Sequence, residues 1–191
     1  MISVEEAKRL AKKTLSERRY AHTCNVRRLA VQLAKRSGED ETKAALAALL
    51  HDIAKELPRD KMLQICAGND IMTKALQERA VPVWHGIVAA VLAKEMYGVE
   101  DEEILSAIAC HTTGKANMTK LDKIIYLADM ASEERTYPEA EALRTHALQN
   151  LDKAAIEGLG MSIAWLKAEG KPVDFATLDA YASLRKNYYG G

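Results

Sequence analysis

The chain has 191 residues, enough for a well-filled domain. Its 27 basic and 27 acidic residues give a formal net charge of +0, so no net field attracts nucleic acid or an anionic membrane surface. The charged start has no apolar signal region, and no later run approaches the roughly 20 apolar residues of a membrane span. The three cysteines form no CxxC pair, which fits reduced thiols. We therefore expect one cytoplasmic domain that binds neither nucleic acid nor membrane.

Apolar residues recur at helical spacing through most of the chain, without strand-like alternation or hairpin signals, which predicts an all-α fold. A capping box formed by Ser3 and Glu6 indicates that the first helix starts near Val4. Gly38 is placed as a helix C-cap, and Pro58 ends the helix that contains residues 40–55. The further helices expected up to the middle of the chain cover residues 19–37, 40–55, 59–67, 73–79, 85–97, 101–110 and 119–129.

The C-terminal part of the chain is also predicted to be helical. Pro138 is expected in the first turn of a helix, and Gly158 and Gly160 are candidate interruptions of the packing that follows. Asp174 is a candidate N-cap of a last helix, and residues 188–191 are expected to form a frayed tail. We expect a single domain with a core over residues 19–135, on which helices over residues 138–187 pack.

Polar side chains lie on the apolar, inward-facing stripes of these predicted helices. Four of the five histidines do so, on four separate helices: His22, His51, His85 and His111. Asp52 follows His51 directly, and Asp129 lies beside the buried face of the helix from about residue 119. Each of these residues taken singly is better explained as a satisfied core or surface side chain. Six buried polar groups together would be costly without partners, and a metal centre satisfies them all.

Imidazoles and carboxylates, with no cysteine at matching positions, suit iron, manganese, cobalt or zinc. Six ligands exceed what one catalytic ion usually takes while keeping a position open for water. The natural partition is therefore two ions with Asp52 bridging them. The fifth histidine, His146, lies in a charged segment and is expected at the surface.

The order His22, His51-Asp52, Asp129 resembles the H…HD…D signature of the HD-domain metal-dependent phosphohydrolases, and the added histidines resemble the members that hold two metals. A narrower resemblance, over about residues 2–186, is to the YqeK-type symmetrical dinucleoside-tetraphosphate hydrolases. The segments that carry it are RYAHTCNV (19–26), HDIAKELP (51–58), HTTG (111–114) and LDKIIYLAD (121–129), followed by Arg135. That family often has Pro-Gly before this arginine, where the present chain has Glu133-Glu134.

The resemblance implies a helical HD-type domain that hydrolyses diadenosine tetraphosphate in the middle and releases two nucleoside diphosphates, ADP or GDP according to the base. A metal-bridging hydroxide would attack an inner phosphorus, with Asp52 and Lys55 as catalytic residues. The two ions, divalent or mixed-valent, would be iron, with manganese, cobalt or zinc as other choices. One ion would be held by His22, His51, Asp52 and Asp129, and the second by His85, His111 and Asp52. A homodimer is a candidate assembly.

The polyphosphate carries more charge than two metals neutralise, so further cations are expected nearby. If the helix continues, Lys55 lies one turn beyond His51, near the phosphates; the alternative is a solvated lysine that complements the helix dipole. Asp122 is a candidate for orienting a neighbouring ligand. The other candidate substrate contacts are Arg19, Thr112, Thr113, Gly114, Lys123 and Arg135. The alternative for residues 112–114 is a simple helix-ending turn, and the alternative for Lys123 and Arg135 is a surface role.

Two alternative functions stay open at this point. One is an HD-type phosphohydrolase of another nucleotide, such as a nucleoside di- or triphosphate or a cyclic dinucleotide. The other is a non-catalytic nucleotide-sensing protein whose metal site is structural.

Overall fold

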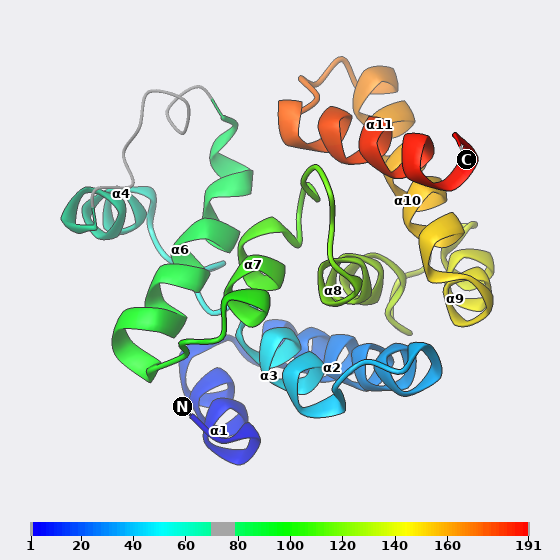
Figure 1. Ribbon diagram of the computed structural model, residues 1–191. Helices are drawn as coiled ribbons and strands as arrows, with labels where there is room; N and C mark the ends of the chain where they lie inside the picture. Colours follow the sequence, from blue (N-terminus) through cyan, green and yellow to red (C-terminus); the bar gives the residue numbers. More distant parts are fainter. Residues whose placement is uncertain (1, 70–78, 191) are drawn as a thin grey trace.

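The computed structural model describes residues 2–69 and 79–190, and within these ranges every regular element is a helix (Figure 1). The all-α prediction is thus confirmed, whereas the helix predicted over residues 73–79 falls almost wholly outside the described residues. The helices are α1 (Val4–Thr14), α2 (Glu17–Ser37), α3 (Glu41–Leu50), α4 (Arg59–Gly68), α6 (Val81–Tyr97), α7 (Glu102–Cys110), α8 (Lys120–Ala131), α9 (Ala140–Gln149), α10 (Leu151–Ala168) and α11 (Phe175–Tyr189).

Local capping chemistry sets many of these boundaries. The Ser3 hydroxyl accepts from the backbone N–H of Glu6, whose carboxylate accepts in turn from the Ser3 N–H, as the capping box predicts. Helices α2 and α6 end at Gly38 and Gly98, whose φ angles of 68° and 63° lie in the left-handed region that glycine adopts without strain. Asp174 caps α11, as expected.

Helix α3 ends at Leu50, so the prediction that it reaches Lys55 is wrong. The chain follows tighter i to i+3 turns after Leu50, with the Lys55 N–H donating to the Asp52 carbonyl at 2.9 Å. This path replaces the α-helical bonding pattern at the His51-Asp52 pair. The pair therefore lies in a turn directly after a buried helix.

The C-terminal part departs from prediction at three points. Helix α9 begins at Ala140, so Pro138 precedes the helix and does not lie in its first turn. Helix α10 runs unbroken through Gly158 and Gly160. A Cβ at Gly158 would lie 3.1 Å from the Met130 sulfur of α8, so this glycine allows α8 and α10 to approach closely. Helix α11 includes Tyr188 and Tyr189, which were predicted to belong to a frayed tail, and Gly191 of that tail lies outside the described residues.

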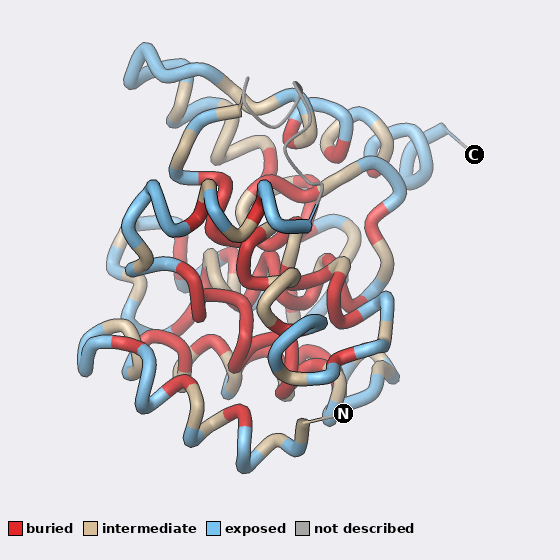
Figure 2. Tube along the Cα trace, turned by 90° about the vertical axis from the view of Figure 1, so that its left-hand side faces the viewer, coloured by how far each residue is buried: buried red, intermediate tan, exposed pale blue. Residues whose placement is uncertain are grey.

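The centre of the molecule is formed by α3, α7 and α8. Helix α2 packs against α3 and α8, α6 packs against α7, and α9 and α10 pack against α8. Every residue of α3 from Ala44 to Leu50 is buried, as expected for a helix that is apolar on all sides. Figure 2 shows the buried residues gathered in the middle of the trace, with exposed segments around it.

None of the helices in the described part of the chain has the length and apolarity of a membrane span.

Candidate metal centre

The fold brings six predicted ligands to one buried point. His22 comes from α2, the His51-Asp52 pair from the turn after α3, His85 from α6, His111 from the end of α7 and Asp129 from α8. The histidines and Asp52 are all buried. These six residues are called the metal centre below.

Asp52 lies in the middle of the metal centre, and its two oxygens face different histidines. Its Oδ2 lies 3.5 Å from Nε2 of His51 and 3.8 Å from Nε2 of His22. Its Oδ1 lies 3.1 Å from Nε2 of His85 and 3.7 Å from Nε2 of His111. One carboxylate thus stands between two halves of the centre, as a bridging ligand would.

Asp129 belongs to the half that contains His22, since its Oδ1 lies 3.0 Å from the Nε2 atom of that histidine. Two groups of three residues have ligand atoms within 4.8 Å of one another: His22, His51 and Asp129, and His51, Asp52 and His111.

Backbone carbonyls fix the orientation of three imidazoles. The Nδ1 atoms of His51, His85 and His111 lie 2.6, 2.7 and 2.7 Å from the carbonyl oxygens of Ala48, Pro82 and Ile108, each three residues earlier in the chain. A carbonyl only accepts, so each Nδ1 carries the proton and each Nε2 presents a lone pair to the centre. The fourth imidazole, that of His22, is held by the carboxylate of Glu134.

Unpartnered acceptors make the centre costly without a cation. In the described part of the chain, His22 Nε2, His51 Nε2 and Asp52 Oδ1 are buried and make no hydrogen bond. The Nε2 atoms of His85 and His111 lie 3.0 Å apart, although both face the centre as acceptors. Buried acceptors without donors cost free energy, which a bound cation would offset. The residues present therefore fit metal ions that prefer nitrogen and oxygen ligands.

The electrostatics of the site give His111 and the two carboxyls the ionisation states that metal binding needs. Burial, with the imidazole of His51 acting in the same direction, lowers the pKa of His111 to about 3, so His111 is neutral at pH 7. Burial alone would raise the pKa of Asp52, but the neighbouring histidines His51, His85 and His111 together outweigh it and hold that pKa well below its usual range. Burial alone would also raise the pKa of Asp129, but its contact with His22, together with the nearby histidines, outweighs burial and lowers that pKa. Both carboxyls are therefore ionised at neutral pH.

Four predicted substrate contacts lie at the rim of the metal centre. Arg19 Nη1 donates to Asp52 Oδ2 at 2.9 Å, and Lys55 Nζ lies 3.3 Å from His85 Nε2. Lys55 thus reaches the site through the turn after α3 and not through a helical continuation. The Thr112 hydroxyl lies 3.2 Å from His111 Nε2, and Arg135 donates to Asp129 Oδ1 at 2.7 Å.

Three of the residues predicted to contact the substrate make other contacts in this structure. Thr113 is buried and donates to the Gly114 carbonyl, and a Cβ at Gly114, whose φ is 67°, would lie 3.0 Å from Ala180 of α11. These two residues therefore form the helix-ending turn that was their structural alternative. Lys123 pairs with Asp152 of α10 at 2.5 Å.

Two other polar residues were assigned from the sequence. Asp122 caps α8 and accepts from the Ser106 hydroxyl at 2.7 Å, so it does not orient a ligand as hypothesised. His146 is exposed and pairs with Glu157, as expected of a surface residue.

Sequence reasoning missed two residues that shape the metal centre. Glu134 holds His22, and no spacing rule connects a loop residue to a histidine so far away in the sequence. Gly86 follows His85 in α6, where an added Cβ would lie 2.9 Å from the Ala109 carbonyl oxygen of α7. A glycine inside an apolar helix is a recognisable signal of such close packing.

A cleft of about 660 Å³ opens beside the metal centre. Its polar lining includes His111, Thr112, Asp129 and Arg135, and its aromatic lining includes Tyr126, Tyr137 and Trp165. Trp165 is 57% exposed. The cleft therefore extends from the metal centre to the exposed side chain of Trp165.

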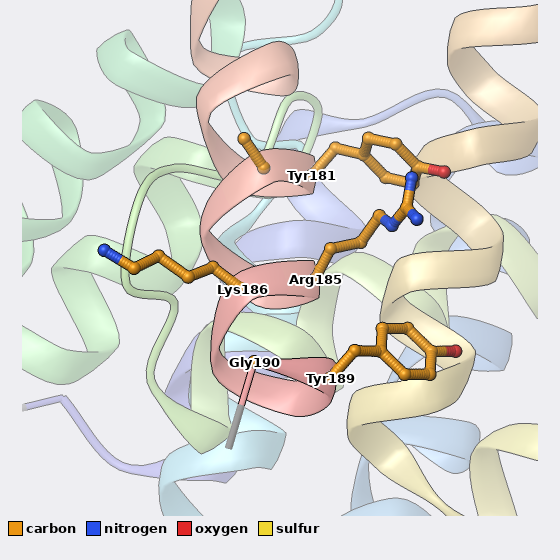
Figure 3. Close-up of a pocket in the computed structure, with 6 residues that line it drawn as sticks. Tyr181, Arg185, Lys186, Tyr189 and Gly190 are labelled. Atoms are coloured by element: carbon orange, nitrogen blue, oxygen red, sulfur yellow. The ribbon is translucent and has the colours of Figure 1, made fainter.

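A separate pocket of about 430 Å³ lies along α11 and contains none of the predicted site residues. Figure 3 shows Arg185 beneath the ring of Tyr181 and Lys186 pointing to the other side of the helix. The Arg185 guanidinium lies 5.4 Å from the centroid of that ring. This pocket brings no chemistry to the metal centre.

Comparison with known protein families gives the class of protein that the fold and the site define. The model of the HD domain matches residues 19–132, the segment that supplies all six residues of the metal centre. The chain therefore belongs to the HD-domain family.

Individual relatives match almost the whole chain. It is 39% identical over 169 residues to the symmetrical bis(5'-nucleosyl)-tetraphosphatase of Bacillus subtilis, covering 88% of this chain and 90% of the relative. It is 38% identical over 183 residues to the protein of the same name from Halalkalibacterium halodurans, covering 94% and 95%. Within the HD-domain proteins, the chain thus falls in the family of the symmetrical bis(5'-nucleosyl)-tetraphosphatases.

A solved structure supports the assignment to the HD-domain proteins. The crystal structure of a predicted HD superfamily hydrolase involved in NAD metabolism, from Clostridium acetobutylicum, matches with a TM-score of 0.92 and 34% sequence identity. The match covers 98% of this chain and 99% of that one.

Proposed function

We propose that this chain is a metal-dependent phosphohydrolase that cleaves diadenosine tetraphosphate, or a close dinucleoside analogue, symmetrically into two nucleoside diphosphates. The observation that carries the proposal is the carboxylate of Asp52, placed between two halves of a histidine-rich centre that opens into a cleft. The names of the full-length relatives support the choice of substrate.

In this proposal the two halves of the centre hold two metal ions, with Asp52 as the shared ligand. One half consists of His22, His51 and Asp129, and the other of His85 and His111. When bound, two such ions supply Lewis-acid activation of water and of the phosphoryl group. Iron is our first choice, since histidine and carboxylate ligands suit it, and manganese, cobalt or zinc are the other candidates.

The chain's own cations complete the charge balance. The substrate brings several negative charges into a protein of net charge +0, so its phosphates need local positive partners. Arg19 lies within hydrogen-bonding reach of Asp52, and Lys55 lies within reach of His85. Arg135 lies on the side of the cleft, where its planar guanidinium can bind two phosphate oxygens at once.

The cleft provides the place for one nucleoside half of the substrate. Its volume falls within the range of pockets that hold small ligands, roughly 300–1,000 Å³. A phosphate at Arg135 and Thr112 would leave the attached nucleoside among Tyr137, Met161 and Trp165, which line the same cleft. We propose that the base stacks on the exposed ring of Trp165.

The test is incubation of the metal-reconstituted protein with diadenosine tetraphosphate, followed by separation of the products. ADP as sole product is expected, whereas ATP plus AMP, or no turnover, would overturn the proposal. Asp52→Ala should abolish turnover, and His146→Ala, a change at an exposed histidine, should not. Faster turnover of a nucleoside triphosphate or a cyclic dinucleotide would favour the other phosphohydrolase function. A structural metal predicts instead that Asp52→Ala mainly lowers the melting temperature.

A further inference from the structure

One histidine of the metal centre is oriented differently from the other three. His51, His85 and His111 each direct Nδ1 to a neutral backbone carbonyl. His22 directs Nδ1 to Oε1 of Glu134, a charged group 112 residues further along the chain. The opposite nitrogen of the same ring, Nε2, faces Asp129 and Asp52 at the centre.

Glu134 is itself held in place by two other side chains. The Ser132 hydroxyl donates to Oε1 at 2.8 Å, and the Asn25 amide donates to Oε2 at 2.8 Å. Asn25 lies on α2, close to His22, while Ser132 directly follows α8. The carboxylate therefore bridges the helix that carries His22 and the end of the helix that carries Asp129.

A carboxylate on the far side of an imidazole affects a metal more strongly than a carbonyl does. Its negative charge attracts the Nδ1 proton and raises the electron density at Nε2, which makes Nε2 a better ligand. It also fixes the plane of the ring, so less freedom is lost when a metal binds. Among the described histidines of the centre, only His22 has such a partner.

We infer that Glu134 is a positioning residue that orients His22 and strengthens its bond to a metal in the Asp129 half of the centre. This inference rests on the metal site of the proposed function and does not depend on the identity of the substrate. Glu134 contacts His22 at Nδ1, on the side of the ring away from the metal-facing Nε2, and it therefore acts through the His22 ring.

The neighbouring residue provides a matched control. Glu133 carries the same charge, but its side chain is 61% exposed and pairs with Arg28, which is itself 53% exposed. The side chain of Glu134 is 34% exposed. Glu133→Gln and Glu134→Gln thus remove the same charge from adjacent positions, and only the second change removes it from His22.

The experiment measures Co²⁺ binding to the metal-free protein by competition with a chelating indicator, together with the visible absorption of the Co²⁺-loaded protein. Glu134→Ala should weaken Co²⁺ binding by about 10- to 100-fold and change the absorption spectrum. Glu134→Gln keeps a hydrogen-bond acceptor and should lie between Glu134→Ala and the wild type. Glu133→Gln should bind within about twofold of the wild type. Melting curves of the metal-free variants identify any loss of folding.

Two results would overturn the inference. One is wild-type Co²⁺ affinity in folded Glu134→Gln and Glu134→Ala; the other is an equal weakening by Glu133→Gln, which would mean a general effect of surface charge. Failure of the proposed function would be seen in the cleavage assay and not in the Co²⁺ affinities. If the wild type binds Co²⁺ and the variants follow the expected order, the inference stands even when diadenosine tetraphosphate is not cleaved.

Discussion

Gly86 lies at a close approach between α6 and α7, the two helices that present His85 and His111. An alanine there would place its Cβ 2.9 Å from the Ala109 carbonyl oxygen and 3.2 Å from the Ile108 carbonyl oxygen. Both neighbours are backbone atoms, which cannot rotate away. We predict that Gly86→Ala forces α6 away from α7 and separates the two histidines.

The size of the effect follows from two opposing terms. An ordinary van der Waals contact of a Cβ begins at 3.4 Å, so the helices would have to separate by roughly 0.5 Å at this point. This displacement is comparable to the tolerance of about 0.5 Å within which the residues of a functional site must be held. Overpacking typically costs about 1–3 kcal/mol, while replacing glycine by alanine inside a helix gains about 1 kcal/mol. The free energy of unfolding should therefore fall by about 0–2 kcal/mol, and metal affinity at the His85–His111 half should fall because the ligand geometry is disturbed.

The assay combines the melting temperature of the metal-free protein with Co²⁺ stoichiometry and affinity. Gly160→Ala is the matched control, because a Cβ there would lie 3.5 Å from the Tyr181 ring, an ordinary contact in the interior of α10. This control should be stabilised by about 1 kcal/mol and bind metal normally. The reasoning would be refuted if Gly86→Ala behaved like Gly160→Ala in both measurements.

Three further outcomes are expected. Removal of bound metal with a chelator should lower the melting temperature, because buried acceptors such as Asp52 Oδ1 lose their partner. Identical calorimetric unfolding curves with and without the chelator would contradict this prediction. Burial alone would lower the pKa of His51, but Asp52, Asp129 and the Ala48 carbonyl together outweigh it and raise that pKa. A proton on His51 thus competes with metal, so Co²⁺ affinity should fall by up to about tenfold for each pH unit below that pKa. The competition would be excluded if Co²⁺ titrations at pH 8 and pH 6 gave the same affinity. Trp165→Ala should raise KM for diadenosine tetraphosphate by about tenfold with little change in kcat, whereas Phe175→Ala, at an exposed aromatic residue outside the cleft, should leave KM unchanged.

Local sequence signals were sufficient for most helix boundaries. Ser3 with Glu6, Gly38 and Gly98 act within a few residues of the chain, so their effect can be read from spacing alone. The end of α3 could not be read in this way. Its alanine- and leucine-rich sequence continues to favour helix past Leu50, while hydrogen bonds of the turn at His51 and Asp52 redirect the chain.

The gathering of these six polar side chains in the interior was also predictable, because a histidine or aspartate on an apolar stripe faces the interior. Burial of an unpaired polar group is costly, and this rule applies before any tertiary contact is known. The structure brings all six to one point. The surrounding cations were less predictable, since Lys123 has the same charge as Lys55 but pairs with Asp152.

The sequence by itself therefore determined the helical class, most helix ends and the set of polar side chains that must share the core, because these depend on periodicity and on short-range capping. Only the tertiary structure decided which partner each of these groups meets. Glu134 reaches His22 across 112 residues, and Gly86 matters because a carbonyl of another helix lies against it. Such contacts depend on how helices and loops are placed in three dimensions, and no local spacing encodes that placement.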